Sequence, residues 1–599
     1  NTDLCFGYDT NSSTITSYDT KNVLCTSDVV IPNTIAGWPV LNIGNGAFYN
    51  KGLTSVTLPS TIENIYSSAF ANNNLTEIHL PVGLREIQSN AFTYNQIADV
   101  VIPNTVTYLS GFGYNLITSI TIPSSVVTIG NSAFFENAIT ELVIPSNVKT
   151  LESSAFCYND IVNLELSEGL EHISPQTFWS SNLSSVTIPS TVRYLAGFEY
   201  NSLSTVTIPE GVTTIGYGAF RWNNMAGTVT IPSTVTTIEQ MAFFSNIITS
   251  IVVPNSVTSI GYGAFTNNRL APAQAFVYAR NSNGTSNLAV LESYGGLERA
   301  NVVIPNTVTK IDTNAFFQTY ISNVTLPNNL AYIGDSSFQQ NSISTLNIPN
   351  SVTYIGRAAF SYNALTDFNF PTGTTKILDN TFQYNALPDV TFPNHITEIG
   401  SQSFSSNQLT AITIPNSVVS IGGGAFTNNQ MNTSDAFIYG RNSNGTPNTV
   451  LNSYAGSNRN IVSIPSGATE IGIYCFFGLA INTINIPSGV TILRTHAFYS
   501  MGGGTIINLP NTLITIEQYT FYYSWLNGIT IPNSVTTIGG GAFYYNHLTS
   551  IIIPASVTTI ANGAFSSSGT LTSVTIQGAN PTRFNSTWES IGFPKYLMP

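Results

Sequence analysis

Residues 531–553 read IPNSVTTIGGGAFYYNHLTSIII, and Pro554 then starts the same pattern again. After the proline, the pattern places apolar residues, an Ala-Phe pair and an asparagine at fixed positions, in the order Val535, Ile538, Ala542, Phe543, Asn546, Leu548, Ile551 and Ile553. Copies with a period of about 22 residues fill most of the chain, and such a period is typical of a solenoid whose coils cannot bury their apolar side alone. We therefore predict a repeat solenoid.

The segment before each proline predicts a short strand. Residues 53–59, LTSVTLP, contain the L-x-x-L-x-L pattern of a leucine-rich repeat. In a strand, Val56 and Leu58 would point inward while Ser55 and Thr57 point outward. The proline then ends the strand, because it has no N–H to donate to the ladder.

The predicted fold is a right-handed, curved leucine-rich-repeat array of about 22 coils, in the α/β class or mostly β. We expect its parallel strands to form a concave sheet. The Ile-Gly-x-x-Ala-Phe segment returns along the convex side with a helical turn, and its phenylalanine fills the wide end of each coil. The coils after Pro103 and Pro189 lose residues just before the phenylalanine, which predicts a tighter turn there with the strand unchanged.

Two segments interrupt the repeat, and each reads as a β-hairpin with an Asn-Gly turn, at Asn283-Gly284 and at Asn444-Gly445. The N-terminal segment shares their skeleton and is predicted to cap the first coil. The predicted organisation is an N-terminal hairpin cap (1–30), repeats (31–274), a hairpin island (275–304), repeats (305–435), a second island (436–464), repeats (465–577), and a C-terminal cap or linker stub (578–599) that carries Trp588, Phe593 and Tyr596.

The composition limits the possible partners. Only 8% of the residues are charged, the formal net charge is −13 and the isoelectric point is near 4.7. Basic residues are sparse and unclustered, so nucleic acid and anionic membrane surfaces are not expected as partners. Ser, Thr and Asn interrupt every hydrophobic stretch, so the sequence predicts no membrane-spanning segment.

Four cysteines divide into two kinds. Cys5 and Cys25 can close a loop of about 20 residues, worth roughly 3 kcal/mol in the chain-entropy model, and we predict a disulfide there. Cys157 and Cys475 lie about twelve coils apart, beyond disulfide reach, and are predicted to be small buried residues. One disulfide favours an oxidising, extracellular setting.

An asparagine recurs after the Ala-Phe pair, and we predict a structural role for it. Its amide can bond the N–H and C=O groups of turns in its own and the next coil. The residues at this position include Asn73, Asn95, Asn137, Asn159, Asn223, Asn363, Asn407 and Asn546.

No arrangement of acid, base or nucleophile emerges from the sequence, and the five histidines lack metal-ligand spacing, so we predict neither enzymatic activity nor a cofactor. Two carboxylate pairs, Glu77 with Asp99 and Asp367 with Asp389, fall on outward positions of adjacent strands. Such pairs repel each other unless a cation such as Ca²⁺ offsets the charge. The alternative is that these carboxylates are simply solvated on an open sheet, and the sequence leaves both interpretations open.

Two surfaces are candidates for partner binding. The outward strand row is mostly Ser, Thr or Asn, including Thr187, Thr207, Thr391 and Thr413, and a neutral hydroxyl surface suits a protein or glycan partner. The second candidate is the pair of islands, where Arg280 with Asn283 and Arg441 with Asn444 occupy matching places. The islands can equally serve only to space the blocks or to cover an edge.

The coil P-x-x-V-x-x-I-G-x-x-A-F-x-x-N-x-L-x-x-I-x-I resembles the BspA-like (Treponema-type) leucine-rich repeat family of bacterial and protist surface proteins. The resemblance implies a secreted or surface-attached protein associated with adhesion. The expected function is therefore non-enzymatic recognition or adhesion, at the cell surface or outside the cell, of a protein or glycan on another cell, host or matrix. The alternative is a structural protein that self-associates into an extracellular filament or surface layer.

Overall fold

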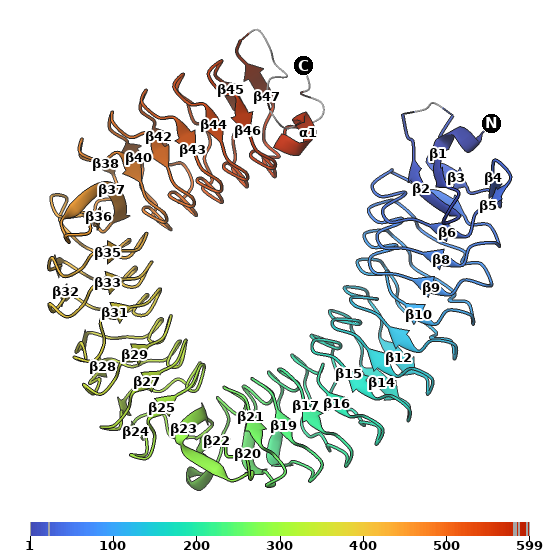
Figure 1. Ribbon diagram of the computed structural model, residues 1–599, viewed down its shortest axis with the longest axis horizontal. Helices are drawn as coiled ribbons and strands as arrows, with labels where there is room; N and C mark the ends of the chain where they lie inside the picture. Colours follow the sequence, from blue (N-terminus) through green and yellow to red (C-terminus); the bar gives the residue numbers. More distant parts are fainter. Residues whose placement is uncertain (1, 22–23, 579–583, 585–586, 595–596, 598–599) are drawn as a thin grey trace. The chain divides into compact units, whose positions relative to one another are not determined.

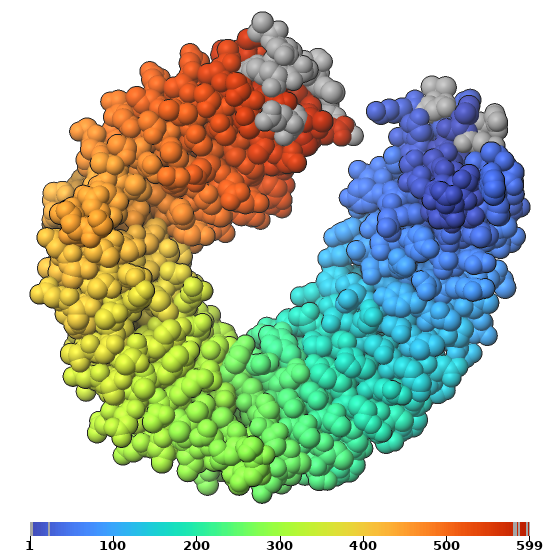
Figure 2. All heavy atoms as spheres, in the orientation of Figure 1, coloured from blue at the N-terminus to red at the C-terminus, as the bar shows by residue number. Residues whose placement is uncertain are grey.

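The computed structural model describes residues 2–21, 24–578, 584, 587–594 and 597. They form two compact units, Asn1–Leu297 and Glu298–Pro599, and each unit is a stack of β-coils (Figure 1). The chain makes about 24 turns, which confirms a mostly β repeat solenoid. Neighbouring coils within each unit touch without gaps on the face that Figure 2 shows.

The longest ladder in each unit is not the predicted strand but a two-residue strand that follows it in every coil. We call it the isoleucine ladder, because its strands end in Ile or Leu just before the turn. In the first unit β2 (Thr14–Tyr18) starts it, and it continues in parallel through β6 (Asn42–Ile43), β8 (Asn64–Ile65), β9 (Glu86–Ile87), β10 (Tyr108–Leu109), β11 (Thr128–Ile129), β13 (Thr150–Leu151), β15 (His172–Ile173), β16 (Tyr194–Leu195), β17 (Thr214–Ile215), β19 (Thr237–Ile238) and β21 (Ser259–Ile260). In the second unit the same position of the coil forms strands in three separate sheets. The first holds β25 (Lys310–Ile311), β27 (Tyr332–Ile333) and β29 (Tyr354–Ile355), and the second holds β31 (Lys376–Ile377), β33 (Glu398–Ile399) and β35 (Ser420–Ile421). The third holds β39 (Glu470–Ile471), β41 (Ile492–Leu493), β43 (Thr515–Ile516), β44 (Thr537–Ile538) and β46 (Thr559–Ile560).

The predicted L-x-x-I-x-I strands, here called the outward strands, also pair in parallel but only in twos and threes. In the first unit they are β3 (Asp28–Val30) with β7 (Ser55–Thr57), β12 (Glu141–Ile144) with β14 (Asn163–Leu166), and β18 (Ala226–Thr230) with β20 (Ile247–Val252). In the second unit they are β24 (Val302–Val303) with β26 (Val324–Thr325), β28 (Thr345–Leu346) with β30 (Asp367–Phe368), β32 (Asp389–Thr391) with β34 (Ala411–Thr413), β38 (Ile461–Ser463) with β40 (Thr483–Asn485) and β42 (Ile506–Asn508), and β45 (Ser550–Ile553) with β47 (Ser573–Ile576).

The Ala-Phe segment forms turns instead of the expected helical turn. Ser68 and Asn72 have positive φ angles of 56° and 57°, and together with Phe70 they donate their N–H groups to carbonyl oxygens of the next coil. The intervening Ala69 and Ala71 donate within their own coil. This turn segment is therefore a third backbone connection between coils. A helical turn would bond its N–H groups internally and forfeit that connection.

The phenylalanines of the turn segments stack in one column through each unit. In the first unit, rings of adjacent coils lie 4.9–5.8 Å apart and are nearly parallel, in the order Phe48, Phe70, Phe92, Phe112, Phe134, Phe156, Phe178, Phe198, Phe220, Phe243 and Phe265. Each ring is completely buried. Burial of a large apolar side chain contributes about 1.5–3 kcal/mol, so this column is the core of the array.

The predicted structural role of the recurrent asparagine is confirmed, but its amide bonds its own coil and the preceding coil instead of the next one. Asn95 accepts the N–H of Leu75 at 3.0 Å and donates to the carbonyl oxygens of Phe70 and Phe92, both at 3.0 Å. The same contacts recur at Asn73, Asn115, Asn137, Asn159, Asn201, Asn223, Asn246, Asn268, Asn341, Asn363, Asn385, Asn407, Asn429 and Asn546. One side chain thus joins adjacent coils at a corner where the backbone alone leaves polar groups unsatisfied.

The two shortened coils keep their ladder strands and tighten the turn, as expected. Glycines with positive φ, Gly111 and Gly197, stand just before the phenylalanine in these coils. A Cβ atom at Gly111 would lie 2.6 Å from the carbonyl oxygen of Gln88, and one at Gly197 would lie 2.7 Å from that of Ser174. Only glycine fits this close approach, because any side chain would collide with the preceding coil.

Three antiparallel hairpins share one design. They are β1 (Phe6–Asp9) with β2, β22 (Phe276–Arg280) with β23 (Ser286–Tyr294), and β36 (Phe437–Arg441) with β37 (Pro447–Tyr454). Each pairs its first phenylalanine with its last tyrosine, as Phe6 does with Tyr18. Tyr18 packs on Phe48 at 5.2 Å and Tyr454 on Phe476 at 5.4 Å, so each of these tyrosines starts a column of stacked rings.

The N-terminal hairpin carries the predicted disulfide, between Cys5 and Cys25, with a Cα–Cα distance of 5.7 Å. A short 3₁₀ helix, η1 (Thr2–Cys5), leads into this hairpin, and β4 (Thr34–Ile35) pairs with β5 (Trp38–Pro39) after it. Cys157 and Cys475 are free and buried, as expected. A second 3₁₀ helix, η2 (Pro272–Gln274), precedes β22.

The last coil is covered by the C-terminal segment. α1 (Trp588–Ile591) is the only α-helix among the described residues, and the carbonyl oxygens of Ser590 and Ile591 accept the N–H groups of Gly563 and Phe565. The ring of Phe593 stacks on Phe565 at 4.9 Å and so ends the column. Tyr596, which the sequence also placed in this cap, lies outside the described residues.

The asparagine ladder makes a testable prediction. Asn95→Ala leaves the buried N–H of Leu75 and the carbonyl oxygens of Phe70 and Phe92 without this partner, and each unsatisfied buried group costs about 1–3 kcal/mol. We expect the free energy of unfolding, measured in urea, to fall by at least about 2 kcal/mol. Asn74→Ala, at an exposed neighbouring asparagine, is the control and should change it by less than about 0.5 kcal/mol. Equal effects of the two substitutions would contradict the assigned role.

Candidate recognition surfaces

The outward strands present a regular row of exposed side chains. Thr187, Thr207, Thr391 and Thr413, predicted from the sequence as binding residues, are all exposed. Thr391 and Thr413 lie directly opposite each other in the parallel pair β32–β34. The same row also exposes apolar residues, including Val101 (77% exposed), Val303 (64%) and Ile506 (58%). The row therefore mixes hydroxyl groups with β-branched apolar groups.

A cavity of about 540 Å³ opens between β30 and β32 and collects several of the predicted residues. Its lining includes Asp367, Asp389, Thr391 and His395, together with the rings of Phe368 and Phe370. The Nε2 atom of His395 lies 3.1 Å from the carbonyl oxygen of Pro371, so this nitrogen is the donor. The structure thus brings one predicted carboxylate pair and one predicted threonine to the same cavity.

Pro388 removes one of the backbone hydrogen bonds between neighbouring coils at this cavity. At the matching position of other coils, Thr366 donates its N–H to Ser344 at 2.9 Å and Thr410 donates to Pro388 at 2.8 Å. Pro388 has no N–H and cannot make the corresponding bond to the coil of Thr366. β30 and β32, on either side of this position, belong to different two-stranded sheets.

A second cavity, of about 370 Å³, holds the other predicted pair. Glu77 and Asp99 line it together with His79 and the exposed Val82 and Val101. Among the described residues, no group of three or more His, Cys, Asp and Glu side chains is arranged to hold a metal ion. Calcium binding by Glu77 with Asp99, or by Asp367 with Asp389, therefore remains a prediction from the sequence.

The island arginines hold their own turns. Arg280 donates to the carbonyl oxygen of Gly284 at 2.8 Å, and Arg441 makes the same bond to Gly445 at 2.9 Å. The side-chain oxygen of Asn283 accepts from the N–H and the hydroxyl of Thr285, and Asn444 repeats this with Thr446. Asn283 and Asn444 are exposed, whereas burial lowers the pKa of both guanidinium groups.

The tips of both islands rest on the preceding coil. A Cβ atom at Gly284 would lie 1.7 Å from the carbonyl oxygen of Asn255, and one at Gly445 would lie 1.8 Å from that of Asn416. Both glycines also have positive φ angles, 78° and 80°. The tip is therefore the feature that joins an island to the coil in front of it.

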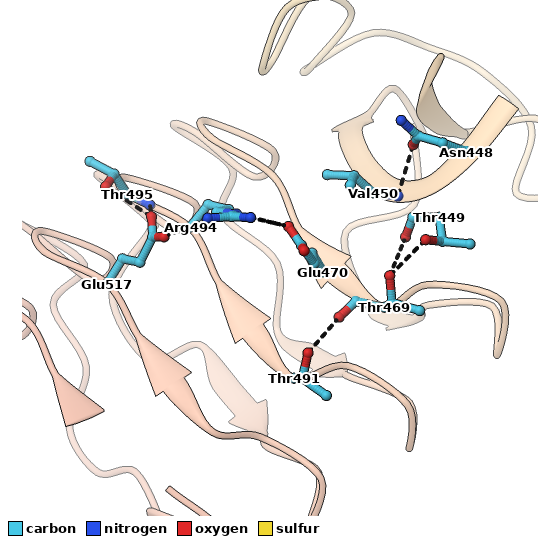
Figure 3. Close-up of polar contacts among 9 residues, drawn as sticks. All are labelled: Asn448, Thr449, Val450, Thr469, Glu470, Thr491, Arg494, Thr495 and Glu517. Carbon is cyan, nitrogen blue, oxygen red and sulfur yellow. Dashed lines mark hydrogen bonds and ion pairs between the residues drawn. The ribbon is translucent and has the colours of Figure 1, made fainter. Parts of the chain in front are cut away.

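Charged side chains near the second island are engaged in contacts between coils (Figure 3). Arg494 bonds Glu470 at 2.6 Å and Glu517 at 2.8 Å, and Glu517 also accepts the backbone N–H of Thr495. Burial alone would lower the pKa of Arg494, but the two carboxylates raise it. Beside them, the hydroxyl of Thr469 donates to that of Thr449 at 2.7 Å. These groups tie coils together and are not arranged for acid–base chemistry.

One carboxyl group is deeply buried in the first unit. Both oxygens of Glu199 accept the N–H of Gln176, at 3.0 and 3.1 Å, and burial raises the pKa of this carboxyl to about 8. The N–H of Gln176 and the cation of Arg221 oppose that shift only in part. Arg221 lies 4.7 Å from the ring centres of both Trp179 and Trp222. This cluster is enclosed by the turn segments rather than open to a substrate.

Aromatic side chains on the turn segments form a surface that sequence reasoning missed. Many occupy the position two residues after the column phenylalanine, where the backbone is left-handed, as at Tyr94 (φ 57°), Tyr200 (φ 54°) and Tyr545 (φ 53°). This conformation costs a bulky residue about 1–2 kcal/mol. The sequence signal was a Tyr or Trp directly before the recurrent asparagine, as in Tyr94-Asn95.

We define two strips from these rings. The first aromatic strip, in the first unit, consists of Tyr94, Tyr114, Phe135, Tyr158, Trp179, Tyr200 and Trp222. The second aromatic strip, in the second unit, consists of Phe477, Tyr499, Tyr522, Tyr523, Tyr544 and Tyr545.

A family model described as "BspA type Leucine rich repeat region (6 copies)" matches residues 13–113, 41–159, 109–226, 194–273, 293–407, 375–441 and 448–579. The chain belongs to this family. Membership of this family suggests a protein-binding or adhesion-type role in general. The family assignment confirms the resemblance seen in the sequence.

Solved structures similar to this BspA-type chain share its fold at low identity. A leucine-rich cell surface protein from Faecalibacterium prausnitzii is 22% identical, with 62% of this chain and 92% of that chain covered and a TM-score of 0.38. The pneumococcal vaccine antigen PcpA is 16% identical, with coverages of 67% and 78% and a TM-score of 0.34. YopM from Yersinia enterocolitica is 14% identical, with coverages of 88% and 90% and a TM-score of 0.38. No curated protein matches the sequence.

Within the part of this BspA-type chain that the structure describes, none of the helices combines the length and the apolar composition that crossing a bilayer requires.

The docking of the island tips can be tested by substitution. Gly284→Ala places a Cβ atom against the carbonyl oxygen of Asn255, so we expect a loss of about 3 kcal/mol in the free energy of unfolding of the first unit. Gly37→Ala is the matched control, because Gly37 also has positive φ but no atom lies within 4 Å of the added carbon. This control should cost only about 1 kcal/mol. A loss at Gly284 no larger than at Gly37 would show that the tip does not rest on the coil.

Glu199 predicts a pH dependence of stability. Its folded-state pKa is about 8, above the unfolded value of 4.5, so between these pH values the unfolded chain binds fewer protons and the free energy of unfolding falls as pH rises. Glu199→Gln should remove that part of the fall, making the variant more stable than the wild type at pH 8. Urea unfolding of the wild type and of Glu199→Gln at pH 4.5 and at pH 8 measures this difference in the free energy of unfolding. Glu136→Gln, at an exposed carboxylate, serves as the control, and an unchanged pH profile in Glu199→Gln would contradict the assignment.

Proposed function

We propose that this chain is a non-enzymatic recognition protein of the cell surface or extracellular space. It binds a protein or glycan on another cell, a host or a matrix through the row of outward strands. The observation that carries the proposal is the contrast between this row and the rest of the coil. The side chains of Thr187, Thr207, Thr391 and Thr413 are exposed. The recurrent asparagines and the column phenylalanines are instead buried in contacts within and between coils.

The cavities give this row points of greater specificity. The carboxylates Asp367 and Asp389 and the rings of Phe368 and Phe370 line the cavity at Pro388. Such a cavity accepts a protruding side chain or sugar, while the flat threonine row on either side contacts the remainder of the partner. The exposed Asn283 and Asn444 of the island turns add amide groups at a second place on each unit.

The buried and ion-paired titratable groups support a role without catalysis. Glu199 accepts a backbone N–H, and Arg494 donates to both Glu470 and Glu517. A general acid or base must reach a substrate proton, and these groups are already engaged within the coil stack.

The proposal predicts that bulky charge on the outward row abolishes adhesion. Thr391→Arg combined with Thr413→Arg should weaken binding to target cells or matrix at least about tenfold, because the two side chains lie opposite each other in the centre of the row. Thr353→Arg, at an exposed threonine beside the isoleucine ladder, should leave binding unchanged. Binding is measured by flow cytometry and surface plasmon resonance. Full binding by the double variant, with an unchanged melting temperature, would reject the outward row as the binding surface.

Exposed apolar residues favour a second candidate function, self-assembly into an extracellular filament or surface layer. Val101, Val303 and Ile506 are each more than half exposed on the outward row, and exposed apolar groups on strands promote association between copies. Sedimentation across concentration, with and without Ca²⁺, separates the two functions. A monomer at all concentrations supports recognition, and ordered assembly supports the structural role. Assembly only with Ca²⁺ would assign a function to the carboxylate pairs.

A further inference from the structure

The first aromatic strip consists of two runs of ring contacts over consecutive coils, Tyr94 to Tyr158 and Trp179 to Trp222. Tyr94 stacks on Tyr114 with ring centres 4.2 Å apart, Tyr114 contacts Phe135 at 5.1 Å, and Phe135 contacts Tyr158 at 5.5 Å. Further along, Trp179 contacts Tyr200 at 5.1 Å, and Tyr200 contacts Trp222 at 4.3 Å. The strip therefore extends over seven coils of the first unit.

The rings of the strip come from two different positions of the coil. In five of its coils the ring comes from the second residue after the column phenylalanine, as at Tyr94 and Trp222. In the two coils where that residue is Glu136 or Ser180, the residue before it is aromatic instead, namely Phe135 or Trp179. A ring is thus present in each coil from either position. Fold stability does not require this, since other coils carry no ring at either position, as at Ala71-Asn72 and Thr266-Asn267.

The backbone conformation argues that these rings are kept for a purpose other than stability. The residues at the second position have φ angles between 53° and 57° in the strip. Asparagine and glycine adopt this conformation most easily, and Asn72 and Asn267 occupy the same position in other coils. Bulky residues held in such a conformation cluster at functional sites.

The second unit repeats the feature independently. Phe477 contacts Tyr499 at 5.3 Å, Tyr499 contacts Tyr522 at 5.4 Å and Tyr522 contacts Tyr544 at 5.3 Å, while Tyr523 stacks on Tyr545 at 4.4 Å. Tyr523 and Tyr545 again have left-handed backbones.

We propose that the two aromatic strips bind uncharged polysaccharide chains laid along the coils. Tyr94, Tyr158 and Tyr200 are 51%, 48% and 45% exposed, so ring surface and phenolic hydroxyls are both open to a ligand. The strip runs past many coils, which suits a polymer better than a single small molecule. This inference rests on the recognition role proposed above, but it uses a different face of the coil.

Charge selects the class of polymer. With a net charge of −13, the chain repels anionic polymers such as nucleic acid or acidic polysaccharides. The residues that flank the strips are mostly uncharged amide and hydroxyl groups, including Asn72, Ser180, Ser245, Ser500 and Ser567. Aromatic rings beside neutral donors and acceptors match a ligand that carries apolar C–H faces and hydroxyl groups but no charge, as neutral sugars do.

The test uses asparagine in place of tyrosine, because asparagine fits the left-handed backbone. Tyr94→Asn with Tyr114→Asn removes one stacked pair, and Tyr523→Asn with Tyr545→Asn removes the other. The full chain is run in native gels containing a neutral β-linked glucan, a galactomannan or amylose, with polygalacturonate as the charged probe and neutral lipid vesicles as a further one. We expect retardation by at least one neutral polysaccharide and roughly tenfold weaker binding after loss of a pair.

The control is Tyr320→Asn, since Tyr320 is an exposed tyrosine with a φ angle of 58° that lies outside both strips. It should leave binding unchanged, and the strip variants should melt at the same or a higher temperature than the wild type. The inference is overturned if the wild type binds none of the neutral polysaccharides, binds only polygalacturonate or vesicles, or if the strip variants bind as well as the wild type. Thr391→Arg with Thr413→Arg should keep polysaccharide binding, so failure of the strips leaves the outward row to be judged separately.

Discussion

Each coil of this chain turns corners at which backbone N–H groups and carbonyl oxygens lose their partners, and the buried asparagine amide satisfies them there. At Asn95 one oxygen accepts from one strand segment and one NH₂ group donates to two coils. Neither a longer amide nor a carboxylate offers this combination of reach, donors and acceptor. The ring column can close only because the corners are satisfied, since burying the phenylalanines brings those backbone groups into the interior with them.

The same constraint divides each coil into surfaces with different freedom. The Ile or Leu that ends each strand of the isoleucine ladder and the rings of the column are fixed by burial, so the residue types at these positions vary little. The outward row and the turn segment have side chains that point away from these contacts, and there the chain varies between Thr, Val, Asp, Tyr and Trp. Recognition can therefore change from coil to coil while Phe112, Phe134 and their equivalents hold the fold unchanged.

Much of this fold could be predicted from the sequence because period and burial are linked. The spacing of Val535, Ile538, Phe543 and Asn546 identified the solenoid, the ring position and the amide, and Cys5 with Cys25 identified the disulfide. The dominance of the isoleucine ladder could not be predicted, because a two-residue strand has no pattern of its own. The cavity at Asp367 and Asp389 was not predicted, because the L-x-x-I-x-I pattern indicates where a strand can form and not which neighbouring strands pair. The aromatic strips were missed because a Tyr or Trp before the recurrent asparagine, as in Tyr94-Asn95, does not by itself indicate a left-handed backbone or an exposed ring.

Each of the three hairpins opens a block of coils. Tyr18 and Tyr454 each start a column of rings in the same way, and the second does so in the middle of the chain. The block of coils from one hairpin to the next, here called a cassette, therefore has its own first ring. Gene duplication or deletion between such hairpins would lengthen or shorten the array by a whole cassette and leave no ring column without a start.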